Sequence, residues 1–242
     1  MNPVSTTAPR PSEGIARWLH ISFAMVTFAT GIVDAVSYLG LGRVFSANMT
    51  GNVVLLGFAA ARTPGLSVER STVALIAALA GGVYAGRLEK NLRPQNRRRW
   101  IVSAAASECG LLSIAAILAF FWAASNSPSP AVEFSLIALT AFGMAIRNST
   151  VRHMGAADIT TTVLTLTVAG LSSESSLAGG TNPHWGRRVI AIVTMLAGAF
   201  VGACLLRKSM AFALGMAAIF VLCAVVIHAL CEQPFPETKP VG

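Results

Sequence analysis

The chain has 242 residues, of which 54% are hydrophobic and only 12% charged, and its formal net charge is +8. A soluble domain has about 25% charged residues, so this composition excludes a protein whose whole surface faces water. The apolar residues form continuous blocks of about 20, the length with which a helix crosses a bilayer, and they lack the alternation of a β-barrel strand. Basic residues flank these blocks, which indicates membrane orientation and gives no reason to expect nucleic-acid binding.

Eight apolar segments lie between two polar tails, residues 1–17 and 232–242, the first of which we expect to be disordered. The first segment is too long for a signal peptide and should remain as a helix. The second segment opens with polar groups, and the sixth is short and rich in threonine, so both are weak candidates for crossing. The sequence therefore predicts an all-α polytopic transmembrane helix bundle of six full spans plus two short or re-entrant segments. The eight segments cover residues 19–41, 47–61, 71–88, 100–124, 131–151, 158–171, 187–206 and 210–230.

The 18 lysines and arginines discriminate between topologies, because cytoplasmic loops carry an excess of these residues. If all eight segments cross with the N-terminus inside, 7 basic residues lie inside and 11 outside. If the two weak segments do not cross, the basic cluster at residues 87–99 moves inside and the distribution becomes 13 to 5. If only the sixth segment crosses, it is 12 to 6. We favour six spans with a cytoplasmic N-terminus, and seven spans stay open.

Two segments carry pairs of glycines four residues apart. The third contains Gly82 and Gly86, and the seventh contains Gly198 and Gly202. Small residues at this spacing let helices approach closely. Simple helix packing explains both pairs, and a homodimer through these glycine faces is a second expectation.

The chain is predicted to consist of two related halves, residues 18–124 and 125–231. The two weak segments correspond at a constant offset of 110 residues, which aligns Asn48 with Asp158. Three full spans in each half would give the halves opposite orientations, the inverted-repeat plan of many secondary transporters. If all eight segments crossed, the repeats would instead be parallel.

Four stretches of the chain contain characteristic motifs: Gly31–Gly40, Phe45–Asn52, Gly143–Asn148 and Asp158–Thr165. Together they resemble a known family, the YoaK-like proteins, which are bacterial multi-pass membrane proteins defined as a domain of unknown function. The resemblance covers about residues 18 to 230, and its most specific motif is Asn-Met-Thr-Gly-Asn at residues 48–52. It implies a location in the bacterial inner membrane, but it supplies no reaction, substrate or catalytic residue.

Polar residues inside or beside the apolar segments are the candidate site, since each costs several kcal/mol in hydrocarbon unless it is paired or hydrated. Asp34 lies deep in the first segment, and we expect Arg147 to be its partner. Gly51 would let the backbone approach a ligand. The other groups stand at starts of short segments, where they either cap helices or bind a small polar solute. The predicted substrate-binding residues are Asp34, Asn48, Thr50, Gly51, Asn52, Arg147, Asn148, Asp158 and Thr161.

The interpretations of two ionisable groups stay open. Asp34 either fixes helix packing as an ion pair with Arg147, couples transport to protons or ions, or lies close to the headgroups. Glu108, deep in the fourth segment, either pairs with Arg152, relays protons or faces a water-filled cleft.

The sequence contains no hydrolase, metalloprotease, nucleotide-binding or dinucleotide-binding motif, and no metal or cofactor site is expected. The leading hypothesis is a small-solute permease in the inner membrane, with a polar site near the bilayer midplane between the two halves. The alternative is a non-transporting scaffold or sensor whose polar centre only fixes packing.

Overall fold

The computed structural model describes residues 13–125, 129–154 and 164–230, and within these ranges the chain is helical and contains no strand. A single 3₁₀ turn, Ser176–Ala178, connects the sixth helix to the seventh. The predicted all-α fold is confirmed. The α-helices are α1 (Glu13–Gly40), α2 (Met49–Ala60), α3 (Val68–Leu92), α4 (Arg97–Ala124), α5 (Pro130–His153), α6 (Leu164–Ser173), α7 (Trp185–Leu206) and α8 (Met210–Leu230).

Six of the described helices are long and apolar enough to cross a membrane: α1 from His20 onward, α3, α4, α5, α7 and α8. The other two, α2 and α6, have 12 and 10 residues. At 1.5 Å per residue these would span about 15–18 Å, roughly half of a hydrocarbon core. The predicted plan of six long helices and two short ones is confirmed.

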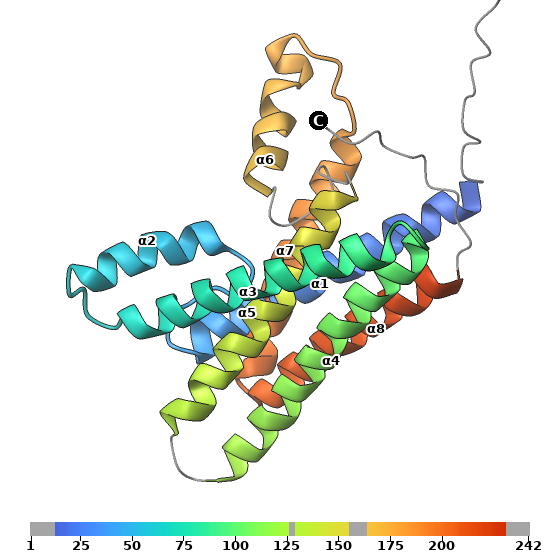
Figure 1. Cartoon of the computed structure of the whole chain (residues 1–242). Helices are drawn as coiled ribbons and strands as arrows, with labels where there is room; N and C mark the ends of the chain where they lie inside the picture. The colour runs from blue at the N-terminus through green and yellow to red at the C-terminus, as the bar shows by residue number, and fades with distance from the viewer. Residues whose placement is uncertain (1–12, 126–128, 155–163, 231–242) are drawn as a thin grey trace, which may run out of the picture.

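The segment that contains α2 leaves the bundle at the end of α1 and returns to the same side of it at the start of α3. Arg43, just after α1, lies against Gly65, just before α3, and Gly42 lies against the side chain of Arg70. The end of α1 is therefore adjacent to the start of α3. In Figure 1, α2 and the first part of α3 form an arm that projects from the bundle, and α6 with the start of α7 forms a second arm.

Helices α3 and α5 lie side by side and run in the same direction. Near their starts, Arg70 pairs with Glu133 at 2.9 Å. Near their ends, the Glu89 carboxylate lies 2.6 Å from Nδ1 of His153. Only α4 lies between α3 and α5 in the chain, so their parallel arrangement means that α4 runs back in the opposite direction.

Helices α1 and α7 form a second parallel pair, in which glycines of α7 lie directly on the backbone of α1. A Cβ at Gly198 would collide with the carbonyl oxygen of Phe28, and one at Gly202 would meet Ile32 Cα at 2.7 Å. The predicted role of this glycine pair in close helix packing is confirmed. Because this face is covered by α1, it does not serve a homodimer in this conformation.

On α3, the predicted glycine pair is wrong by one residue. A Cβ at Gly81 would collide with the carbonyl of Phe142 on α5, and Ala85 one turn later is buried. Gly82 has only an ordinary contact with a serine side chain, and Gly86 has no neighbour within 4 Å in the described chain. The sequence pattern gave the spacing of the small residues, but only the orientation of the helix decides which of two adjacent sets faces its neighbour.

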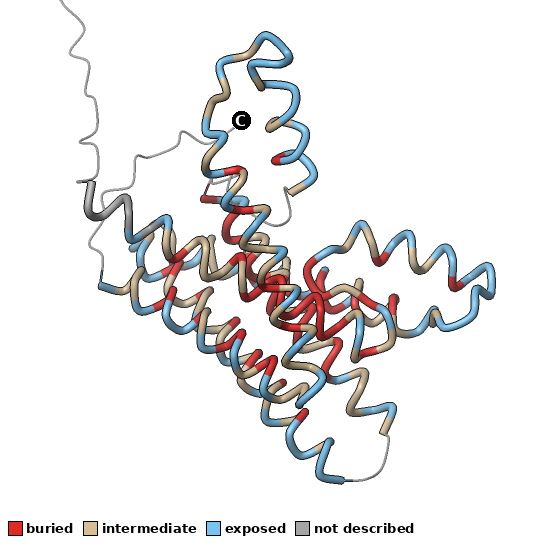
Figure 2. The backbone as a smooth tube through the Cα atoms, turned by 180° about the vertical axis from the view of Figure 1, so that it is seen from behind, coloured by how far each residue is buried: buried red, intermediate tan, exposed pale blue. Residues whose placement is uncertain are grey.

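The core lies where the long helices cross. Besides these pairs, α8 packs against α1 and α4, α4 packs against α5, and each short helix packs against the long helix that follows it. Figure 2 shows buried residues concentrated at this crossing, while the two arms are mostly exposed. Large apolar side chains cover the outside of the bundle, as expected of a surface in contact with lipid. The fully buried apolar side chains of the core include Ile32, Val36, Leu112, Leu136, Met144 and Leu214.

Candidate functional site

Asp34 holds the backbone of the segment that connects α1 to α2. Its Oδ1 atom accepts hydrogen bonds from the N–H groups of Ser46 at 3.1 Å and Ala47 at 2.8 Å. The residue is 7% exposed. Backbone outside a helix has N–H groups without an intrahelical partner, and leaving them unpaired at membrane depth costs several kcal/mol each. The carboxylate therefore satisfies a local need of this connection.

Helix α5 holds the same segment from the other half of the chain. Nδ2 of Asn148 donates to the carbonyl of Ala47 at 3.3 Å. The hydroxyl of Ser46 donates to Thr140 Oγ1 at 2.8 Å. We call this arrangement, Asp34, Thr140 and Asn148 around residues 45–47, the clasp. It brings together two of the predicted site residues, Asp34 and Asn148, through a shared backbone residue.

The Asn-Met-Thr-Gly-Asn motif is bonded to its own surroundings. Oδ1 of Asn48 accepts from the N–H of Gly51 at 3.2 Å, so Asn48 caps the start of α2. Asn52 is buried and holds both backbone groups of Phe45, accepting from its N–H at 2.8 Å and donating to its carbonyl at 2.6 Å. A Cβ at Gly51 would stand 2.8 Å from the Phe45 ring, so here the glycine makes room for that ring. Thr50 is exposed.

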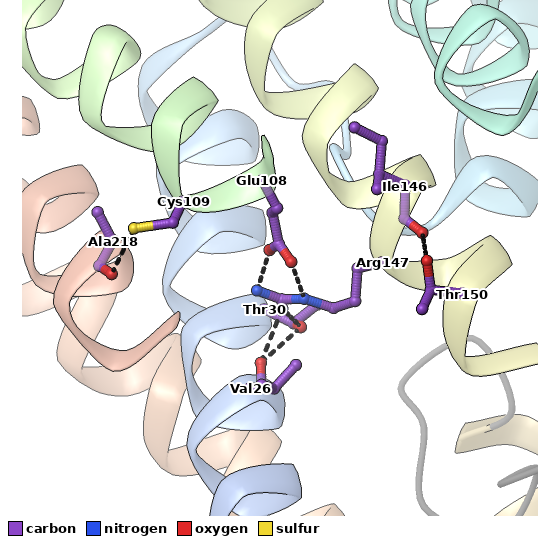
Figure 3. A network of polar contacts seen from close by, with 8 residues as sticks. All are labelled: Val26, Thr30, Glu108, Cys109, Ile146, Arg147, Thr150 and Ala218. Atoms are coloured by element: carbon purple, nitrogen blue, oxygen red, sulfur yellow. Dashed lines mark hydrogen bonds and ion pairs between the residues drawn. The ribbon is translucent and has the colours of Figure 1, made fainter. Parts of the chain in front are cut away.

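The predicted partnership between Asp34 and Arg147 is wrong, because Arg147 pairs with Glu108 on α4. Nε of Arg147 donates to Glu108 Oε2 at 3.0 Å, and Nη2 donates to Oε1. Nη1 donates to the carbonyl of Val26 at 2.8 Å and to the hydroxyl of Thr30, both on α1. Figure 3 shows Glu108 and Arg147 facing each other with Val26 and Thr30 beside the guanidinium. We call these four residues the ion centre.

The ion centre is deeply buried. The side chains of Arg147 and Glu108 are 4% and 3% exposed. Glu108 is the twelfth of the 28 residues of α4, and Thr30 lies in the middle of the part of α1 that can span the membrane. A two-pronged bond between guanidinium and carboxylate is among the strongest polar contacts in proteins. Removing either partner would leave an uncompensated buried charge.

Sequence reasoning identified Arg147 but missed its partner. Of the three interpretations of Glu108, pairing with Arg152 is wrong, because the carboxylate is bonded to Arg147. The available signal was that Glu108 is the single charged residue of the fourth apolar segment, residues 100–124. An isolated buried charge requires a partner of opposite sign, and Arg147 is the basic residue placed well inside a neighbouring segment.

Two predicted site residues, Asp158 and Thr161, lie outside the described residues. Within the described part of the chain, no group of three metal-binding side chains comes together. The clasp and the ion centre are the polar clusters that join α1 to α5 within the described part of the bundle.

Residues 22–227 of the chain match a family described as proteins of unknown function, DUF1275. The chain is 34% identical over 165 residues to UPF0700 transmembrane protein YoaK of Bacillus subtilis (strain 168), an alignment that covers 66% of this chain and 69% of that protein. No solved structure matches the chain. With its six long apolar helices, this multi-pass membrane protein belongs to the DUF1275 family, as the YoaK-like motifs implied.

Proposed function

We propose that this protein is a small-solute permease of the bacterial inner membrane, built from two inverted halves, residues 18–124 and 125–231, that alternately open a central site to each side. The observation that carries the proposal is the symmetry of helix packing. Exchanging α1–α4 with α5–α8 converts the α1–α7 contact into the α5–α3 contact, and the α1–α8 contact into the α5–α4 contact. The same exchange converts α2–α3 into α6–α7 and leaves α4–α8 unchanged.

The closest backbone contacts follow the same exchange. Gly198 lies on the carbonyl of Phe28 in the α1–α7 pair, and Gly81 lies on the carbonyl of Phe142 in the α3–α5 pair. If Phe28 corresponds to Phe142, the residues six positions later, Asp34 and Asn148, also correspond. Both bind Ala47. Inverted repeats with short helices at matching positions are the plan of many transporters that alternate access around a midplane site.

The proposed orientation follows from the basic residues. The start of α1 lies at the same end of the bundle as the ends of α3 and α5, since Phe23 packs in one cluster with Leu92, Trp100 and Met154. That end carries most of the basic residues, including Arg97–Arg99 and Arg152. Cytoplasmic faces are enriched in arginine and lysine, so the N-terminus is proposed to be cytoplasmic.

In this proposal the ion centre is the transport site. Fixed charges in a hydrocarbon environment mark substrate or ion pathways in many membrane proteins. A scaffold or sensor is the second candidate. The contacts of Asp34, Asn48 and Asn52 favour it, because these side chains form hydrogen bonds with the protein's own backbone.

Water access distinguishes the two candidates. In a variant without native cysteines, Thr30→Cys would place a thiol at the ion centre. A permease exposes this thiol to a charged, membrane-impermeant maleimide from each side of the membrane in turn, so labelling is expected from both sides. Leu79→Cys, at an exposed apolar position on the outside of α3, is the lipid-facing control and should stay unlabelled. If Thr30→Cys is labelled from neither side, or from one side only, the result favours the scaffold.

A solute screen in reconstituted vesicles with a proton-sensitive dye would then identify the substrate. Solute-dependent proton movement would show coupling, and uptake without it would show a uniporter. The absence of uptake across the panel, together with an unlabelled Thr30→Cys, would count against transport.

A further inference from the structure

The guanidinium of Arg147 has two sides with different partners. Nη1 is fixed by α1, through the Val26 carbonyl and the Thr30 hydroxyl. The fork formed by Nε and Nη2 is directed at α4 and is filled by the Glu108 carboxylate. Because α1 alone holds Nη1, the position of the guanidinium does not depend entirely on Glu108.

A carboxylate in such a fork occupies the place that a free anion would take. Guanidinium binds planar oxyanions through two parallel N–H donors, and this geometry suits a carboxylate or nitrate as well as the side chain of glutamate. Every nitrogen of the Arg147 guanidinium is a hydrogen-bond donor and the group is positively charged, so the fork selects anions and repels cations. A Cβ at Gly143 would stand 3.7 Å from Glu108 Cγ, so α5 presents no bulky side chain at that point.

We propose that the Nε–Nη2 fork of Arg147 is the binding site for a small monovalent oxyanion and that Glu108 is its resident substitute, displaced when it takes up a proton. This inference rests on the proposed function and specifies its substrate class and coupling. A proton adds to a carboxylate oxygen of Glu108, the neutral acid leaves the fork, and the anion enters with its charge unchanged. The centre has the same net charge before and after, so one proton accompanies one anion.

The other ionisable groups around Glu108 do not provide an alternative counter-charge. On α1, Asp34 is engaged in the clasp. On α4, Cys109 faces α8, where it lies 3.6 Å from the Ala218 carbonyl (Figure 3). On α3, the hydroxyl of Tyr84 is bonded to Ser107 at 3.0 Å. On α8, His228 is at the helix end beside Ser22. Arg147, on α5, is therefore the charged partner of Glu108 within this set.

The test measures proton uptake on anion binding. The full chain, in nanodiscs of uncharged lipid and weakly buffered solution with a pH indicator, is mixed with sodium nitrate or sodium formate, and with sodium gluconate as a bulky anion at equal ionic strength. We expect nitrate and formate to drive uptake of about one proton per chain at saturation, since anion binding and protonation are linked. Gluconate should drive none.

Two variants make the test specific. In Glu108→Gln combined with Arg147→Gln, both charges are absent and uptake should disappear. In Glu133→Gln, which breaks the Arg70–Glu133 pair at the bundle end, uptake should equal that of the unmodified chain. Should the double variant not fold, the unmodified chain decides alone: nitrate should raise its unfolding temperature more at pH 5 than at pH 8, and gluconate should not.

Nitrate and formate without effect on either proton uptake or unfolding temperature would overturn the inference. If Thr30→Cys is nevertheless labelled from both sides, the permease stands and only its anion chemistry is wrong. If labelling also fails, the permease proposal falls with it. Equal uptake in the chain and in the double variant would likewise exclude the fork as the site.

Discussion

The clasp and the ion centre are both polar groups buried in an apolar bundle, but they differ in what they bind. In the clasp, Asp34 and Asn148 bind the backbone of one connecting segment. In the ion centre, Glu108 and Arg147 bind each other. The backbone of a non-helical segment at membrane depth must be satisfied by some group. A pair of opposite charges meets no such requirement, because two apolar side chains could replace it.

This difference in binding partners distinguishes structural polar groups from functional ones more clearly than their burial does. The helix ends at Gly40, and the clasp provides hydrogen-bond partners for backbone groups of the non-helical segment that follows. The ion centre adds two buried charges that helix packing alone does not need. A group that could be replaced without loss of the fold, yet costs desolvation, is the better candidate for a ligand site.

The largest expected effect is at the ion centre. Glu108→Ala leaves the Arg147 guanidinium without a counter-charge and should lower the free energy of unfolding by about 3–5 kcal/mol. Glu108→Gln with Arg147→Gln removes both charges and should recover most of that loss. The measurement is equilibrium unfolding in mixed micelles, followed by tryptophan fluorescence. A double variant as unstable as Glu108→Ala would mean that the pair contributes more than mutual neutralisation.

The clasp should behave differently, because its partner is backbone and cannot be removed along with Asp34. Asp34→Ala leaves the N–H groups of Ser46 and Ala47 unpaired and should cost about 2–4 kcal/mol, at roughly 1–2 kcal/mol for each of the two groups. Asp34→Asn keeps an acceptor oxygen and should cost much less, in the same unfolding measurement. Nearly equal losses in the two variants would show that the negative charge matters, which would reduce the contrast with the ion centre.

For the permease proposal, the Asp34→Asn variant has a further consequence. An acceptor oxygen is enough for the clasp, so this variant should retain both labelling of Thr30→Cys and proton uptake with nitrate. Loss of uptake in a folded Asp34→Asn protein would transfer the coupling role to Asp34.

Helix contact provides a smaller effect and a matched control. Gly198→Ala forces a methyl group onto the Phe28 carbonyl and should destabilise the protein by about 1–3 kcal/mol through overpacking. Gly86→Ala meets no neighbour in the described chain and should be neutral or slightly stabilising, since alanine favours helix by up to about 1 kcal/mol. Thermal unfolding of both variants distinguishes the glycine of α7 that lies on α1 from the glycine of α3 that has no neighbour in the described chain. A costly Gly86→Ala would indicate a partner there, such as a second copy of the chain.

The sequence predicted features that depend on composition and spacing. Long apolar blocks determined the six long helices, and the distribution of arginines favoured the plan in which α2 does not cross. Helix capping by Asn48, one of the two interpretations that the sequence left open, is what the structure shows, and capping is a local interaction. These features are set by neighbouring residues in the chain.

Partners distant in sequence were harder to predict. Arg147 lies 39 positions from Glu108, and only the crossing of α4 and α5 brings the two together. The helices that bury them have apolar residues on all sides, so periodicity does not show which face meets which helix. The shift from Gly82 to Gly81 has the same cause.

The smallest expected effect is at a second glutamate–arginine pair, which shows what burial adds. Arg70 and Glu133 also join two helices, but their side chains are 32% and 16% exposed. Exposed ion pairs contribute about 0–1 kcal/mol and are weakened by salt, so Glu133→Gln should change the unfolding free energy by less than about 1 kcal/mol. Raising sodium chloride in the unfolding measurement should diminish even that difference, while the loss in Glu108→Ala persists. If Glu133→Gln were as costly as Glu108→Ala, ion pairs throughout this bundle would be structural, and the ion centre would have no distinguishing property to support an anion site.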